Sequence, residues 1–90
     1  MNDVEYGNQF KKDFKVVKAR GYKLELLKNV IGILMAGKPL PKQYHDHKLN
    51  NSKEYINVKE CHIQSDWLLI YRLEKGLVTL IRTGTHADLY

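Results

Sequence analysis

Apolar residues in the first half of the chain recur with the period of a helix. Phe10, Phe14 and Val17 lie four and three residues apart, so they fall on one face of a helix. Asn8 can cap the start of this helix with its side-chain oxygen, and Gly21 is a typical residue just beyond a helix end. A first helix is therefore predicted between Asn8 and Gly21.

A second helix is predicted after Gly21, where the apolar positions are denser. Its stripe consists of Leu24, Leu27, Ile31 and Leu34, widened by Leu26, Val30 and Ile33. Gly37, followed by Pro39 and Pro41, stops this helix. Because only a tight link separates the two helices, we expect a helical hairpin with a basic surface.

Strand-like segments flank this hairpin. Residues 3–6 are predicted to form a short strand, and residues 54–63, 66–73 and 77–83 are rich in β-branched and aromatic side chains. The sequences QS and EKG between these three segments are plausible hairpin turns. The order predicts an α+β fold: a short N-terminal strand, a two-helix hairpin and a C-terminal three-stranded antiparallel meander, with the helices packed on one sheet face.

The last predicted strand does not reveal which of its sides faces the core. Strict alternation places Val78, Leu80 and Arg82 on one side. The other side has Leu77, Thr79, Ile81 and Thr83. Both sides carry large apolar residues, so the face that packs on the helices stays open.

The polar connection at residues 38–53 is longer than the usual ~4–6 residues, and such loops often carry function. All four histidines lie in this connection or beyond it, at His45, His47, His62 and His86. A meander brings strand ends together, so a shared site is possible. Taken singly, each of these histidines would more often be an exposed or structural residue.

The composition favours an ordinary globular protein, with 43% hydrophobic and 28% charged residues. Ninety residues predict one domain, residues 1–90. No apolar run approaches a membrane span and no signal peptide is recognisable, so a cytoplasmic location is expected. The single cysteine, Cys61, rules out an internal disulfide framework and is expected to be a small, half-buried residue.

Positive charge is concentrated in the first half of the chain. The net charge is +5, and residues 11–48 contain ten Lys and Arg against three acidic residues. Such a field favours a polyanion such as nucleic acid, or an acidic protein, although lysine-rich helix surfaces are commonly just solvated.

Three stretches carry a family resemblance: YHDHKLN, ECHIQSDWLLIYRL and RTGTHADLY. They are similar to segments of the YafQ branch of the RelE superfamily of toxin messenger-RNA endoribonucleases, and the resemblance covers essentially the whole chain as a single toxin domain. It implies an RNA-cleaving site on the sheet that uses no cofactor or metal. It also implies mRNA as substrate, action in association with the ribosome, and a cognate acidic antitoxin as partner.

The resemblance implies the site residues His47, His62, Asp66, Trp67, Arg82, His86 and Tyr90, whereas His45 has no match. Cutting RNA without a metal requires a base, a cation and an acid. Histidine can exchange a proton near neutrality, and arginine offers paired donors to phosphate. We therefore expect Arg82 to clamp the transition state and His86, with His47 or His62, to transfer protons.

Asp66 and Trp67 each have two possible roles. Asp66 could orient a histidine or transfer a proton, or it could cap the hairpin turn. Trp67 and Tyr90 could stack on bases, although Trp67 could equally pack in the core. Gly84 allows the backbone to turn, so that His86 and Tyr90 fold back over the site. The lysines expected to bind RNA phosphates, some of which could instead face the antitoxin, are Lys11, Lys12, Lys15, Lys18, Lys38, Lys42 and Lys48.

Three other functions are compatible with parts of the sequence. A non-catalytic RNA- or ribosome-binding module would use the same lysines and aromatic residues, but it does not require histidines and an arginine. A zinc enzyme built on His45 and His47 lacks a recognised ligand spacing. A protein that only forms complexes would need the apolar helix stripe to be exposed, whereas the stripe is most simply the domain core.

Overall fold

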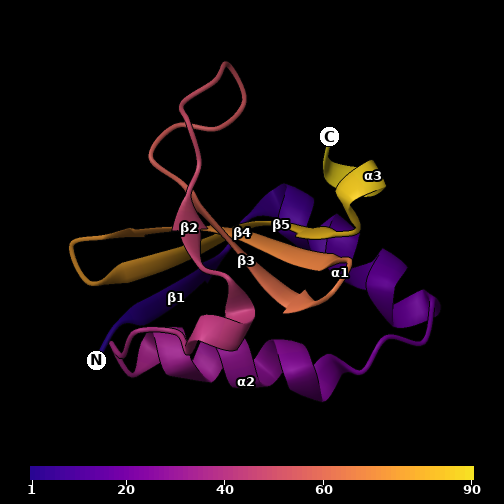
Figure 1. The fold of residues 1–90 in the computed structure, drawn as a ribbon, viewed down its shortest axis with the longest axis horizontal. Helices are drawn as coiled ribbons and strands as arrows, with labels where there is room; N and C mark the ends of the chain where they lie inside the picture. The colour runs from indigo at the N-terminus through magenta and orange to yellow at the C-terminus, as the bar shows by residue number, and fades with distance from the viewer.

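The chain forms one mixed sheet, and its two long helices contribute to the same core on one face of the sheet (Figure 1). The computed structural model describes residues 1–90. Its elements are β1 (Asp3–Tyr6), α1 (Asn8–Ala19), α2 (Leu24–Met35), the 3-10 helix η1 (Lys42–Tyr44), β2 (His47–Lys48), β3 (Lys59–Gln64), β4 (Trp67–Glu74), β5 (Leu77–Gly84) and α3 (His86–Leu89). The sheet order is β1-β5-β4-β3-β2. β1 runs parallel to β5, and every other pair is antiparallel.

The predicted α+β class is confirmed, together with the N-terminal strand and both long helices. The predicted sheet was wrong in detail, because it is a mixed sheet of five strands that includes β2. The strand expected at residues 54–63 begins only at Lys59. Tyr55 lies in a turn closed on Ser52, and Asn57 has a positive φ of 54°, so the chain before Lys59 cannot be extended.

The start of α1 also differs from the prediction. Gly7, and not Asn8, is the N-cap, and no side chain caps this helix. The Gly7 N–H donates to the Leu80 carbonyl at 2.9 Å, and a Cβ on Gly7 would lie 2.7 Å from that oxygen. The close approach of β1 to β5 therefore requires glycine here. The predicted helix ends are confirmed, because Gly21 has a φ of +80° and Gly37 of +73°.

Both faces of the sheet are covered by apolar side chains. The helix-side core consists of Phe10, Val17, Leu27, Val30, Leu34, Cys61, Ile63, Trp67, Leu69, Tyr71, Val78 and Leu80. A smaller second core on the opposite face consists of Tyr55, Val58, Leu68, Ile70 and Leu89. In Figure 1, α2 runs below the sheet, while the loop after β2 and α3 lie above it. The alternation in β5 could not assign a core face because both faces are cores.

An irregularity in β5 changes the side on which Arg82 lies. Tyr71 pairs with Leu80 and Ile70 pairs with Arg82, so Ile81 is an extra residue opposite β4. Leu80 therefore belongs to the helix-side core, whereas Arg82 shares the face of Ile70 in the second core. The predicted grouping of Arg82 with Val78 and Leu80 was wrong, because a bulge interrupts the alternation.

Cys61 is fully buried in the helix-side core, and not half-buried as expected. Burial raises the pKa of its thiol to about 12, so the residue packs as a small apolar side chain.

None of the helices has the length and apolar character needed to cross a membrane.

Two leucines of β4 test this arrangement. Leu69 is 0% exposed in the helix-side core, and Leu73 on the same strand is 45% exposed. Leu69→Ala is expected to lower the free energy of unfolding by about 2–5 kcal/mol in urea denaturation, because it leaves a cavity. Leu73→Ala, the matched control, is expected to change it by less than about 1 kcal/mol. Equal losses in the two variants would contradict the two-layer core.

Candidate active site

A row of side chains crosses the sheet on the face opposite the helices, which we call the site face. His47 of β2 pairs with Glu60 of β3, Glu60 with Ile70 of β4, and Ile70 with Arg82 of β5. Directly paired residues lie on the same face of a sheet. The register therefore brings residues from positions 47, 60 and 82 of the sequence onto one line.

Glu60 is the centre of this row. The residue is 4% exposed, and Oε1 lies 3.5 Å from Nε2 of His47 and 3.9 Å from Nε2 of His62. The Tyr90 hydroxyl donates a hydrogen bond to Oε2. Burial, together with this bond to a carboxylate, raises the pKa of Tyr90. Burying a carboxylate without such partners would destabilise the fold. The two imidazoles and the phenol hydroxyl offset this effect at Glu60.

The C-terminal tail brings Tyr90 and His86 to the row, and it turns at Gly84 as expected. Gly84 has a φ of +154°, and a Cβ there would lie 2.9 Å from the Asp88 carboxylate. The Asp66 carboxylate accepts a hydrogen bond from the main-chain N–H of His86 at 3.0 Å. The ring of His86 lies 4.8 Å from the ring of Tyr90. Asp66 therefore holds the backbone of His86, and His86 reaches Glu60 only through Tyr90.

Asp88 anchors the helix α3 that carries this tail. Its carboxylate accepts from the Thr85 N–H, and the Thr85 hydroxyl accepts from the Asp88 N–H, so the two residues form a capping box. Arg20, beyond the end of α1, pairs with the same carboxylate at 2.6 and 3.1 Å. The Arg20 guanidinium is the main reason why the pKa of Asp88 is well below its ordinary value.

Arg82 is held at the edge of β5 by Asp13 of α1. Its Nε and Nη2 donate to the Asp13 carboxylate at 2.7 and 3.2 Å, and this pairing raises the pKa of Arg82. The same carboxylate accepts from the main-chain N–H of Thr83 at 3.2 Å. Tyr55 lies close enough to contribute to the raised pKa of Arg82, although its buried hydroxyl has no hydrogen-bond partner. Asp13 therefore fixes the direction of the guanidinium.

Trp67 has the second of its two predicted positions, in the core. Its side chain is 1% exposed in the helix-side core. The indole N–H donates to Thr83 Oγ1 at 2.9 Å, and the ring packs edge-on against Tyr22. The alternative, packing in the core, is what the structure has. Tyr90, in contrast, is an exposed aromatic residue at the row.

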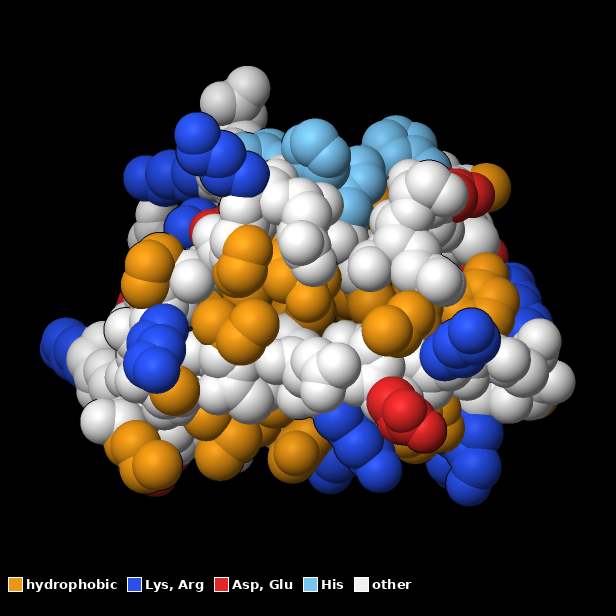
Figure 2. All heavy atoms as spheres, turned by 60° about the horizontal axis from the view of Figure 1, so that its bottom comes forward, with side chains coloured by type: hydrophobic (Ala, Val, Ile, Leu, Met, Phe, Trp, Pro, Cys, Tyr) orange, Lys and Arg blue, Asp and Glu red, His pale blue; other side chains and the backbone are white.

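The predicted lysines are spread over the molecule. Lys11 and Lys15 line a groove between α1 and α2, in the helical layer, and Lys48 extends from β2 beside His47. In Figure 2 the histidine side chains gather along one margin, while many Lys and Arg side chains lie elsewhere.

His45, which was expected to be an unrelated loop residue, is exposed, but its ring lies 5.6 Å from that of His62. No group of three or more His, Cys, Asp or Glu side chains is placed to hold a metal ion.

Sequence reasoning missed three residues of this region: Glu60, Asp13 and Tyr55. Glu60 precedes His62 by two residues, which is the spacing of side chains on one face of a strand, so a signal for it was available. Asp13 and Tyr55 gave no comparable signal. Together the residues of the row offer proton acceptors, proton donors and a fixed cation around one open surface.

Comparison with known proteins identifies this arrangement. Residues 2–90 match the family described as "Bacterial toxin of type II toxin-antitoxin system, YafQ". The chain belongs to the YafQ toxin family. The mRNA interferase toxin YafQ of Escherichia coli (strain B / BL21-DE3) is 39% identical over 89 residues, which are 98% of this chain and 95% of that protein.

Solved structures of YafQ-like toxins have the same fold. YafQ in the E. coli DinJ-YafQ complex superposes with a TM-score of 0.91 at 38% identity, covering 100% of this chain and 99% of that chain. The metal-bound toxin from Helicobacter pylori has a TM-score of 0.89 at 34% identity, with 100% of both chains covered. The resemblance to the YafQ branch inferred from the sequence is confirmed.

The Arg20–Asp88 pair predicts an acid-sensitive tail in this YafQ-family protein. Because the folded pKa of Asp88 lies below its unfolded value, the pair stabilises the fold above about pH 4 and loses this effect as the pH falls further. Asp88→Ala is therefore expected to speed amide hydrogen exchange at Leu89 and Tyr90 at pH 6. The difference from the unmodified protein should shrink at pH 2, and an equally large difference there would contradict a role of the carboxylate charge.

Proposed function

We propose that this protein is the toxin of a type II toxin-antitoxin system and an endoribonuclease that cuts mRNA in the cytoplasm, in association with the ribosome. It works without a metal. The 2′-hydroxyl of a nucleotide attacks the adjacent phosphorus, a 2′,3′-cyclic phosphate forms, and the 5′-oxygen of the next nucleotide leaves with a proton. The single observation that supports this most is the row on the site face, in which His47 pairs with Glu60, and Arg82 follows on the other side of Ile70.

Removal of the proton from the 2′-hydroxyl is the task of the group around Glu60. His47 and His62 both approach its carboxylate, so an imidazole that accepts the proton becomes a cation beside an anion. The carboxylate thereby stabilises the charge that develops on the base. The Tyr90 hydroxyl keeps the other carboxylate oxygen in place.

Stabilisation of the phosphorane charge is the task of Arg82. A guanidinium has five N–H donors, and Asp13 takes two of them. The remaining donors are free to bind the equatorial phosphate oxygens. Because Asp13 holds the group before RNA arrives, little reorganisation is needed during the reaction.

Protonation of the leaving oxygen is assigned to His86. The exposed ring packs on Tyr90, and Asp66 fixes the main chain from which the ring extends. This position is separated from the base by the Tyr90 side chain, which suits an in-line displacement with base and acid on opposite sides of the phosphorus. Tyr90 can also stack on a base beside the cut.

Charge supports the binding of RNA and of an acidic antitoxin. The net charge of +5 favours a polyanion, and the lysines named above are expected to make RNA binding weaken as salt is added. An E. coli relative forms the DinJ-YafQ toxin-antitoxin complex. A cognate acidic antitoxin that covers part of the same basic surface is the corresponding partner here.

Cleavage of labelled RNA in a strong chelator tests this mechanism, with free RNA and with translating ribosomes. The unmodified protein should release fragments that end in a cyclic phosphate. Arg82→Ala and His86→Ala should each slow cleavage about 10²–10⁴-fold, because each removes a group that acts in the transition state. His45→Ala is the control histidine variant and should cut at the unmodified rate.

Two outcomes would contradict the proposal. RNA that stays intact in both settings but is retained in a gel shift would identify a binding module. Fragments that appear only when a metal is restored would identify a metal-dependent enzyme. Circular dichroism of each variant establishes that a loss of cleavage does not reflect unfolding.

A further inference from the structure

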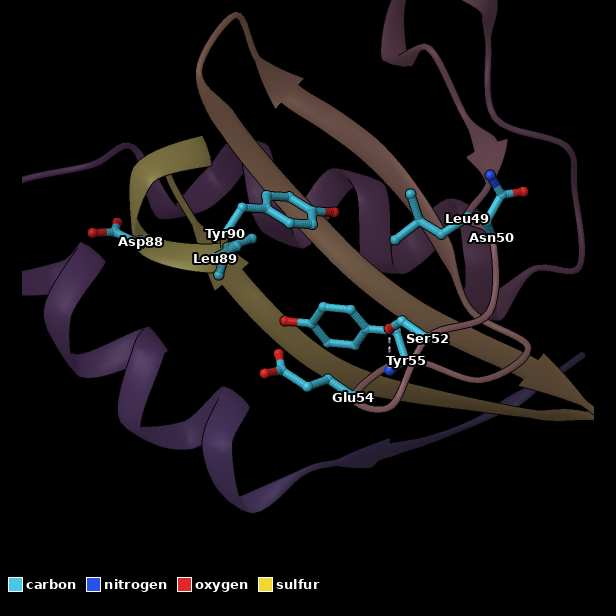
Figure 3. Close-up of a pocket in the computed structure, with 8 residues that line it drawn as sticks. All are labelled: Leu49, Asn50, Ser52, Glu54, Tyr55, Asp88, Leu89 and Tyr90. Atoms are coloured by element: carbon cyan, nitrogen blue, oxygen red, sulfur yellow. Dashed lines mark hydrogen bonds between the residues drawn. The ribbon is translucent and has the colours of Figure 1, made fainter.

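A pocket of about 560 Å³ adjoins the row, and Tyr90 is the one residue that it shares with the mechanism above. It lies between the loop of residues 49–58 and α3 (Figure 3). We propose that it binds the base of a nucleotide next to the scissile phosphate, and that Asn50 and Glu54 at its rim favour a base that carries an amino group. This proposal rests on the endoribonuclease function and adds the origin of its sequence preference.

The walls of the pocket are suited to a flat, apolar ring. The rings of Tyr55 and Tyr90 lie edge to face, with centroids 6.3 Å apart, and Leu89 of the second core also lines the pocket. In Figure 3 the two tyrosines lie next to each other between the loop and α3. Aromatic surfaces of this kind bind bases by stacking, whatever the base.

Both tyrosines connect the pocket to the reacting groups. The Tyr90 hydroxyl donates to Glu60, and Tyr55 packs in the second core with Ile70, the residue of β4 that pairs with Arg82. The Tyr55 hydroxyl is buried and has no partner in the protein. A base held against these rings therefore places its own sugar and phosphate within reach of the row.

The polar groups at the rim favour a base over a phosphate. Asn50 supplies an amide, Ser52 a hydroxyl and Glu54 a carboxylate, while no Lys or Arg lines the pocket. A carboxylate repels phosphate but accepts from the exocyclic amino groups of adenine, cytosine or guanine. Uracil would instead present carbonyl oxygens beside its single N–H. The rim thus favours an amino-bearing base.

The loop is held in shape before any ligand binds. The Leu49 N–H donates to the Val58 carbonyl at 3.0 Å, which closes the base of the loop. Within it, the Ser52 N–H donates to the Tyr55 carbonyl at 2.8 Å, and the Ser52 hydroxyl accepts from the Tyr55 N–H at 3.1 Å. Arg72 of β4 donates to the Ile56 carbonyl. A preformed loop loses little entropy on binding, so its few polar groups can discriminate between bases.

Cleavage-site mapping on a randomised RNA tests the proposal. The unmodified protein should prefer an amino-bearing base at one position beside the cut. Asn50→Ala and Glu54→Gln should reduce that preference roughly 10- to 100-fold at this position only, while the least-favoured base is cut as before. Glu25→Gln, which makes the same change on α2, is the control and should leave the profile unchanged.

A binding measurement provides a readout that does not depend on cleavage. Adenosine monophosphate is expected to shift the NMR signals of Tyr55 and Leu89 at lower concentration than uridine monophosphate, and Glu54→Gln should remove the difference. Equal binding of the two nucleotides, or an unchanged cleavage profile in both rim variants, would overturn the proposal. Failure of the unmodified protein to cut RNA in any setting, with nucleotide binding intact, would overturn the nuclease function instead.

Discussion

The extra residue in β5, Ile81, decides which face of the sheet carries the chemistry. Without it, Arg82 would share the side of Leu80 and point into the helix-side core. A buried guanidinium without a partner there would strongly destabilise the fold. With it, Arg82 lies opposite Ile70 and in line with Glu60. Before the bulge, Val78 and Leu80 of β5 face the helix-side core. After the bulge, Arg82 faces the opposite side, where Asp13 holds its guanidinium.

The second core gives the site its rigidity. A small sheet with helices on one face usually leaves the other face in water, where loops and tails are mobile. Here Tyr55 from the loop and Leu89 from α3 pack on Leu68 and Ile70. The loop and α3 are therefore held to the sheet by apolar contacts, and α3 is followed directly by Tyr90, whose hydroxyl donates to Glu60.

The sequence pattern predicted the two helices through their period, and the strands β4 and β5 through their β-branched and aromatic residues. It failed where the chain departs from regular geometry. Tyr55 and Ile56 look like strand residues but lie in a loop, since Asn57 turns the backbone. No local pattern predicts an extra residue at Ile81, because a bulge depends on the partner strand. Family resemblance supplied His86 and Arg82, yet it could not reveal that Trp67 is buried.

The loop of residues 49–58 is tied to the sheet by the Leu49–Val58 hydrogen bond at its base, by Arg72 of β4, which donates to the Ile56 carbonyl, and by Tyr55 in the second core. Asn50 and Glu54 are exposed and take no part in these contacts, so they can be exchanged without disturbing the groups that we propose to act in cleavage. In such a fold, the residues that select the RNA sequence lie apart from the residues that cleave it. Related toxins can therefore evolve different sequence preferences through substitutions in this one short loop, while the residues on the sheet stay the same.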